Sequence, residues 1–139
     1  MYDLTAIEVA VLDKLLSGDD SVLECLRSQL RFAKILSREH TGVGQYSKFT
    51  FTTPVVPLEG QPSFCFGDVR AAITGVPNGA GFLLWIEQGL ISELEAYTYQ
   101  EEMPITVDEF VLMYNTDGER DIGSLRRTAD WAGWPGLIS

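Results

Sequence analysis

Glu93 and Glu95 are the residues whose type and spacing could carry out chemistry in this chain of 139 residues. Two-residue spacing on an extended segment puts both carboxylates on one side, with about 6 to 7 Å between their backbones. Carboxylate pairs at this range can act as general acid and base. Alternating glutamates on a strand usually form its solvated side, so we assign no catalytic residue.

Aromatic and acidic neighbours favour a binding surface instead. Tyr97 and Tyr99 continue the alternation of the two glutamates, and Glu101 and Glu102 follow them. Aromatic anchors beside charged groups are typical of protein interfaces. From Glu87 to Asp121 the chain has ten acidic residues and one basic residue, within a net charge of −10. This excess favours a basic protein partner and repels nucleic acid.

A pocket for a small molecule or a substrate is the alternative hypothesis. It would lie between the predicted helices and the central hairpin, near Tyr46, Trp85 and His40, with Tyr97 and Tyr99 close by. His40 is the only histidine, so a multi-histidine metal site is excluded. It could serve as a base for Ser47 or Cys65, although its expected place at a helix end already explains it. No metal or cofactor is expected.

A hairpin from Gly79 to Tyr99 must position the glutamates and tyrosines. Its two strands meet at Gln88-Gly89, where a glycine in the second place suits a primed turn. Pairing outward from this turn predicts an apolar face made of Leu83, Trp85, Leu94 and Ala96. The other face would mix glutamates and tyrosines with Phe82, Leu84, Ile86 and Ile91. A bulge near the turn would reverse this assignment.

Two helices are predicted before the sheet. Thr5-Ala6-Ile7-Glu8 matches a capping box, and Ser17-Gly18 ends the first helix. Ser21-Val22-Leu23-Glu24 matches a second capping box. Apolar residues then recur at helical spacing as far as Leu36, so this helix is expected to end near His40.

The remaining segments predict strands. An alternating strand is expected near Tyr46 to Thr53, and another from Phe64 to Thr74 with a bulge at Gly67-Asp68. The segment from Ile105 to Tyr114 fits either a helix or a strand, and we favour a strand from about Glu109 because the apolar run is short. A short helix near Ser124 to Asp130 and a docked aromatic tail, Trp131 to Ser139, would follow.

These elements predict a single α+β domain over residues 1–139. Two N-terminal helices would cover one face of an antiparallel meander of about four to five strands. The hydrophobic fraction of 45% favours a compact chain. The N-terminus lacks the pattern of a signal peptide, and no apolar stretch approaches the roughly 18 to 20 residues of a membrane span. We therefore expect a cytoplasmic protein without membrane contact.

Four short motifs resemble those of a group of small bacterial proteins, most of them uncharacterised. The motifs are Thr-Gly-Val-Gly, Gly-Asp-Val, Gly-Ala-Gly-Phe and Leu-Glu-x-Tyr-Thr-Tyr, found here at Thr41–Gly44, Gly67–Val69, Gly79–Phe82 and Leu94–Tyr99. The likeness spans roughly Arg38 to Pro104, with Ala96 where the group has glycine. It implies no catalytic residue. In size, acidity and order of elements, the chain also looks like immunity proteins, which implies a basic toxin domain as partner.

The sequence thus supports three hypotheses. The first is a non-enzymatic acidic domain that binds a basic protein through the region from Glu87 to Asp121. The second is a binding protein or enzyme with the pocket described above. The third is a homodimer formed through the mixed face of the hairpin.

Overall fold

The computed structural model describes residues 1–116 and 118–135. Helix α1 (Ala6–Leu15) begins with the predicted capping box, in which the Thr5 hydroxyl accepts from the Glu8 amide at 3.3 Å and the Glu8 carboxylate accepts from the Thr5 amide at 2.8 Å. Gly18 follows the helix with a φ of 125°, a value that glycine adopts at little cost. The first helix and its end therefore agree with the sequence.

Helix α2 (Ser21–Leu30) differs from the prediction at both ends. Its N-cap is Asp20, whose carboxylate accepts from the amides of Val22 and Leu23, so the predicted cap at Ser21 is wrong. The helix stops at Leu30, and the next element is a strand that ends at His40. Long-range strand pairing here overrides the helical spacing of the apolar residues, which is a local signal.

Seven antiparallel strands form one sheet in the order β1-β2-β6-β5-β4-β7, with β3 paired to β5. The α+β class is confirmed, but the strand count exceeds the four to five predicted. The order is also more complex than a meander, because β2 lies beside β6. The strands are β1 (Ala33–His40), β2 (Gly44–Phe51), β3 (Phe64–Phe66), β4 (Val69–Ile73), β5 (Val76–Glu87), β6 (Leu90–Thr98) and β7 (Phe110–Tyr114).

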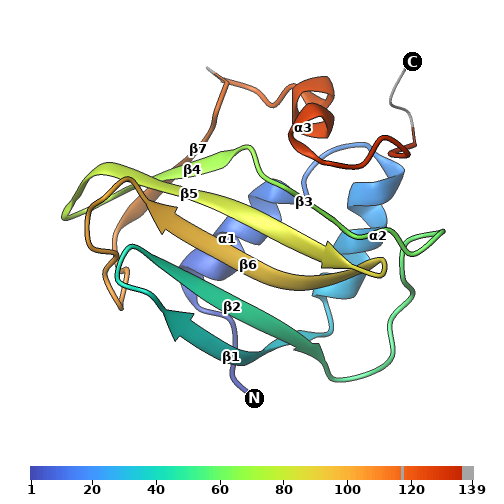
Figure 1. Cartoon of the computed structure of the whole chain (residues 1–139), viewed down its shortest axis with the longest axis horizontal. Coiled ribbons are helices and arrows are strands. Elements are labelled where there is room, and N and C mark those ends of the chain that lie inside the picture. The colour runs from blue at the N-terminus through green and yellow to red at the C-terminus, as the bar shows by residue number, and fades with distance from the viewer. Residues whose placement is uncertain (117, 136–139) are drawn as a thin grey trace.

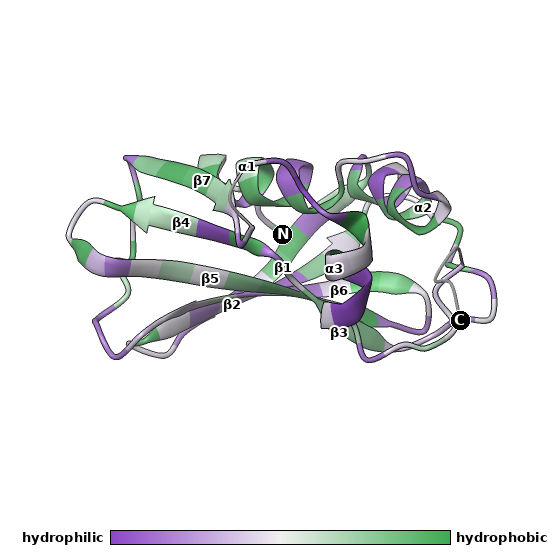
Figure 2. Cartoon of the chain, turned by 90° about the horizontal axis from the view of Figure 1, so that it is seen from above, coloured by the Kyte–Doolittle hydropathy of each residue, from purple (hydrophilic) through white to green (hydrophobic). Residues whose placement is uncertain are grey.

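The helices α1 and α2 lie on one side of the sheet, as Figure 2 shows. Buried side chains such as Leu12, Leu23, Ile35 and Leu84 fill the space between the two layers. The opposite side of the sheet faces the viewer in Figure 1, and no helix of the described chain crosses it. We call this uncovered side the outer face.

The hairpin of β5 and β6 turns at Gln88 and Gly89, both with positive φ, as predicted for a primed turn. Ile86 pairs with Ile91, but the register then shifts at Ser92, so Trp85 pairs with Glu93. This bulge reverses the predicted faces of β5. Alternate residues on β5 now point inward and are buried, namely Phe82, Leu84 and Ile86, whereas Leu83 and Trp85 lie on the outer face.

The predicted strand from Phe64 to Thr74 is split into β3 and β4 by Gly67-Asp68. A Cβ at Gly67 would overlap the Phe82 carbonyl oxygen, so a residue without a side chain is required at this crossing. The favoured strand before Tyr114 is confirmed as β7, and the short helix is α3 (Ile122–Thr128).

The aromatic tail docks as far as the structure describes it. Trp134 is 1% exposed, and its ring meets Phe66 edge to face and packs at a tilt against Phe64 and Trp131. The rest of the predicted tail, residues 136–139, lies outside the described residues. Among the described helices, none has the length and apolar character needed to cross a membrane.

Candidate functional site

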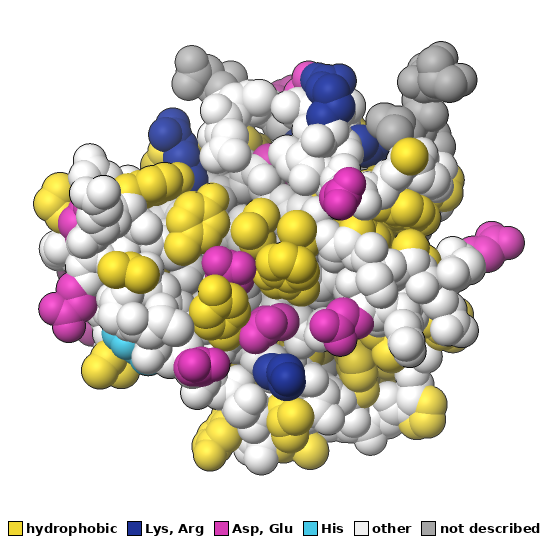
Figure 3. All heavy atoms as spheres, viewed as in Figure 1, with side chains coloured by type: hydrophobic (Ala, Val, Ile, Leu, Met, Phe, Trp, Pro, Cys, Tyr) yellow, Lys and Arg dark blue, Asp and Glu magenta, His cyan; other side chains and the backbone are white. Residues whose placement is uncertain are grey.

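The outer face carries acidic and aromatic side chains from four strands. Strand register brings these side chains together: Tyr46 pairs with Glu95, and Lys48 and Trp85 both pair with Glu93. We define the acidic-aromatic face as Glu39, Tyr46, Lys48, Trp85, Glu93, Glu95, Tyr97 and Tyr99. Figure 3 shows acidic and hydrophobic side chains intermingled over the middle of this side of the molecule, with a basic side chain among them.

Specific contacts hold the aromatic rings of this face in place. The Trp85 indole Nε1 donates to the Glu95 carboxylate at 3.1 Å. The Tyr97 and Tyr99 rings meet edge to face with centroids 5.8 Å apart. Gly81 leaves room for the Tyr97 ring, since a Cβ there would overlap the phenol. Trp85 is nevertheless 38% exposed and Tyr99 51% exposed, so both present apolar surface to solvent.

Negative charge on this face is only partly compensated, by Lys48. Partial burial raises the pKa of Glu93, and the charges of Glu95, Glu87 and Glu39 add to that rise against the opposing effect of Lys48. The ion pairs within 4 Å among the described residues include neither Glu93 nor Glu95. Such a field attracts a positively charged surface.

The same negative charges affect the pKa of Tyr46. The negative charge of Glu95 is the main cause that raises the pKa of the Tyr46 phenol, followed by burial and further by Glu93 and Glu39. Its hydroxyl therefore remains a neutral hydrogen-bonding group beside the carboxylates.

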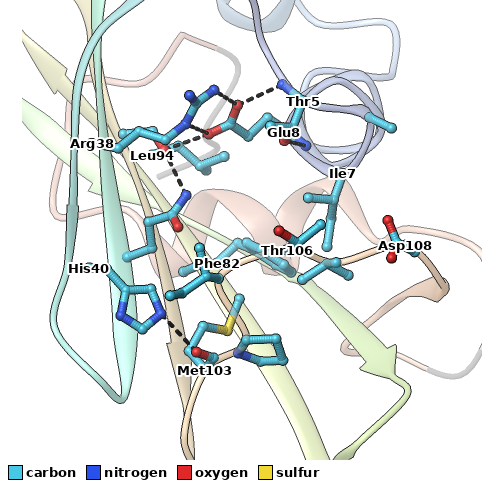
Figure 4. A pocket seen from close by; sticks show the side chains of 17 residues that line it. Thr5, Ile7, Glu8, Arg38, His40, Phe82, Leu94, Met103, Thr106 and Asp108 are labelled. Atoms are coloured by element: carbon cyan, nitrogen blue, oxygen red, sulfur yellow. Dashed lines mark hydrogen bonds and ion pairs between the residues drawn. The ribbon is translucent and has the colours of Figure 1, made fainter.

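A cavity of about 500 Å³ lies on the other side of the sheet, between α1, the inner side of the strands and the segment from Met103 to Asp108. Figure 4 shows Phe82 and Leu94 on one side of it and Ile7 and Thr106 on the other. It corresponds in position to the pocket predicted between the helices and the hairpin. Its lining is mostly apolar, with His40, Thr106 and Asp108 as separate polar residues and a polar cluster where α1 begins.

The polar groups of this cluster are bonded to one another. Glu8 is 4% exposed and accepts from Arg38 Nη2 at 2.6 Å, from Arg38 Nε at 3.1 Å and from the Ser47 hydroxyl at 2.5 Å. Burial raises the pKa of Glu8, but the bonds from Arg38 and Ser47 outweigh it and lower the pKa overall. This carboxylate is a structural ion-pair partner that stays ionised.

His40 lines the cavity from the end of β1, so its predicted place at a helix end is wrong. Its Nε2 lies 2.7 Å from the Met103 carbonyl oxygen, and its Nδ1 accepts from the Gly42 amide at 3.3 Å. Both ring nitrogens are therefore engaged in hydrogen bonds. His40 links the strand end to the loop at Met103 and is not available as a base for Ser47 or Cys65.

The residues proposed from the sequence are grouped differently in the structure. Glu93, Glu95, Tyr97 and Tyr99 do share one face, and Tyr46 and Trp85 join them instead of lining the cavity with His40. Glu101 and Glu102 follow the end of β6, and the Glu101 carboxylate accepts from the Asn78 amide at 2.9 Å.

The acidic stretch as a whole is not one surface. Asp108 lines the cavity and Asp121 caps α3, each away from the strand positions of Glu93 and Glu95. Sequence reasoning missed Glu39 and Lys48 on the acidic-aromatic face. The alternation of β2 could have placed Lys48, but nothing local placed Glu39, which reaches this face only because β1 pairs with β2.

Within the described ranges, no group of three or more His, Cys, Asp or Glu side chains could hold a metal ion. A scan of the sequence against protein-family models found no match, and neither did searches of curated proteins and solved structures.

Proposed function

We propose that this chain is a non-enzymatic binding domain that holds a basic protein on its acidic-aromatic face. The observation that carries the proposal is the combination, on the uncovered side of the sheet, of exposed aromatic rings with glutamates that outnumber the single lysine beside them and form no ion pair within 4 Å. Aromatic side chains supply most of the contact energy in many interfaces, and unpaired charges select a partner of opposite sign.

The arrangement of the two groups suits this role. Trp85 and Tyr99 are large enough to fill depressions on a partner and are held by neighbours, so little side-chain entropy is lost on binding. Glu93 is partly desolvated already, and its negative charge is repelled by the charges of Glu95 and Glu39. A lysine or arginine from a partner would relieve that repulsion.

The partner class follows from charge and from the general likeness to immunity proteins. A basic toxin domain fits a face of this kind, because binding would cover its positive surface. Cys25 and Cys65 are unpaired thiols, which fits a reducing, cytoplasmic location for the complex. Nucleic acid is disfavoured as a ligand by the same field.

The direct test is capture of a basic protein by the immobilised chain from a lysate of the source organism, with elution by salt. The captured protein, once purified, is titrated against wild type and against Glu93→Lys/Glu95→Lys. We expect at least a hundredfold loss of affinity, since two attractive charge contacts become repulsive.

A matched control distinguishes an effect of this surface on affinity from an effect of the net charge of the chain. Asp13→Lys/Glu24→Lys changes the charge of the chain by the same amount at exposed positions on the helices. Equal loss of affinity in both double variants, or retained binding by Glu93→Lys/Glu95→Lys, would refute the proposal. Circular dichroism confirms that each variant is folded.

The cavity beside α1 supports a second candidate function, the binding of a small amphipathic molecule. Its volume and its apolar lining are those of a ligand site. A thermal-shift screen distinguishes the two candidates, because a ligand of the cavity would raise the melting temperature in a saturable way. Leu94→Trp would fill the cavity and abolish that shift while leaving the acidic-aromatic face in place.

A further inference from the structure

Strand β7 forms one edge of the sheet and, within the described part of the chain, pairs only with β4. The pairing is regular over its whole length, from Val69 opposite Tyr114 to Ile73 opposite Phe110, without a bulge. Its sequence, Phe-Val-Leu-Met-Tyr, has no charged residue and no proline. Val111 is 65% exposed.

The main-chain groups of β7 divide into two sets. The Thr74 amide donates to the Glu109 carbonyl, and the Asn115 amide donates to the Asp68 carbonyl. In an antiparallel ladder these bonds recur at every second residue. Phe110, Leu112 and Tyr114 therefore direct their amides and carbonyls away from β4, and these groups have no hydrogen-bond partner within residues 1–116 and 118–135.

The opposite edge, β1, is protected from further pairing. Tyr2 exchanges two main-chain hydrogen bonds with Ile35, both of 2.8 Å, and a bulge follows between Ile35 and Ser37. This strand also carries three charged residues, Lys34, Arg38 and Glu39. Bulges and edge charges are common devices against edge-to-edge association. Strand β7 has none of them.

We propose that β7 pairs with β7 of a second copy of this chain, antiparallel and about a two-fold axis at Leu112. In this register Leu112 lies opposite Leu112 of the partner subunit, and Phe110 lies opposite Tyr114 of the partner subunit. Every outward amide and carbonyl of the strand then has a partner, in three residue pairs with about two hydrogen bonds each. The strand is thus complementary to itself, as a two-fold interface requires.

Side chains and charges fit the same register. On the outer face Val111 meets Met113 of the partner subunit, so exposed apolar surface is covered. Arg70 on β4 is exposed and pairs with Met113 on β7. The ion pairs found among the described residues do not include Arg70. Strand spacing places its backbone about 12 Å from Glu109 of the partner subunit, within the combined reach of the two side chains. A second copy therefore supplies both the hydrogen bonds and an opposite charge.

Light scattering after size exclusion tests the dimer directly. Wild type should have twice the 15.4 kDa mass of one chain. Val111→Lys places a charge at the centre of the edge and should reduce the mass to that of one chain. Val56→Lys is the matched control, because Val56 is 74% exposed in a loop, and it should leave the dimer intact. A monomeric wild type, or a Val111→Lys variant that stays dimeric, would overturn the proposal.

Cysteine cross-linking tests the register in a Cys25→Ser/Cys65→Ser background. Residues directly opposite in a hydrogen-bonded pair have Cα atoms about 5.5 Å apart, a distance that a disulfide can span. Leu112→Cys should therefore give a covalent dimer under mild oxidation. Phe110→Cys lies about 14 Å from its own copy across the axis and should not. Equal cross-linking of the two variants would contradict the assigned axis.

Discussion

Carboxylates on the two sides of the sheet have opposite environments. On the helix side, Glu8 is bonded to Arg38, and Asp20 is bonded to Arg126, and the pKa of each carboxyl is lowered. On the outer face, burial and neighbouring acids raise the pKa of Glu93. The same functional group therefore stabilises the fold on one side and carries unsatisfied charge on the other. This difference is the physical basis for the proposal that the outer face binds a partner.

Asp20 shows how much structure one inner carboxylate supports. It accepts from the amides of Val22 and Leu23 at the start of α2, from the Trp134 indole at 3.1 Å and from Arg126 at 2.7 Å. Burial raises its pKa, but these bonds outweigh it. Asp20 thereby connects α2, α3 and the aromatic tail.

Asp20→Ala should have the largest effect of the changes considered. It removes the helix cap and the ion pair and leaves the buried Trp134 N–H without its acceptor, so we expect a loss of about 3 to 5 kcal/mol in the free energy of unfolding. Denaturant unfolding measures this loss. Asp20→Asn keeps the cap and an acceptor and should cost clearly less. Equal losses would mean that the charge alone matters.

Glu8→Gln is expected to have the next largest effect. The amide keeps one acceptor for the Thr5 amide but cannot pair with the Arg38 charge, and Arg38 is partly solvated, so the loss should be about 2 kcal/mol. The same measurement on Glu95→Gln on the outer face should show a change within about 0.5 kcal/mol. A comparable loss at the outer position would remove the contrast between the two sides.

The dependence of stability on pH should have opposite signs for the ion-paired Glu8 and Asp20 and for Glu93 on the outer face. The lowered pKa values of Glu8 and Asp20 mean that their stabilisation is complete above the ordinary carboxyl pKa and is lost as the pH falls through the lowered values. The raised pKa of Glu93 costs stability above that value, and the cost disappears as the pH falls below it.

Wild type should therefore lose stability overall on acidification, and Glu93→Gln should be slightly more stable than wild type only near neutral pH. Thermal unfolding of the two proteins across acidic and neutral pH measures both trends. A stability difference between the two proteins that grows on acidification would show that Glu93 is stabilised by its surroundings.

Gly81→Ala should have only a small effect on stability. The added methyl displaces the flexible Tyr97 ring from the acidic-aromatic face, while Ala itself favours an ordered strand, so the change should stay below about 1 kcal/mol. Loss of the nuclear Overhauser contact between Tyr97 and Tyr99 reports the displacement. Weaker binding of the basic partner with unchanged unfolding would separate the outer face from the core.

Local signals in the sequence were sufficient for several elements. The capping box at Thr5, the primed turn at Gln88-Gly89 and the short apolar run before Tyr114 each depend on residues close together in the chain. The shared side of Glu93 and Glu95 follows from strand alternation alone. These features were predicted because the atoms involved are a few bonds apart.

Other features needed the tertiary structure. The bulge at Ser92 decides which side of β5 is buried, and the choice between Asp20 and Ser21 as cap depends on partners more than a hundred residues away, Arg126 and Trp134. The segment ending at His40 has helical spacing but becomes a strand because β2 and Tyr2 pair with it.

The sequence by itself determined the α+β class, the central hairpin and the alternation that puts two glutamates and two tyrosines together. Only the tertiary structure decided that Tyr46, Trp85 and Glu39 join them, and that Glu8 is neutralised by an arginine thirty residues away. The physical reason is that propensity and periodicity act over a few residues, whereas strand register, burial and charge pairing depend on which distant segments meet.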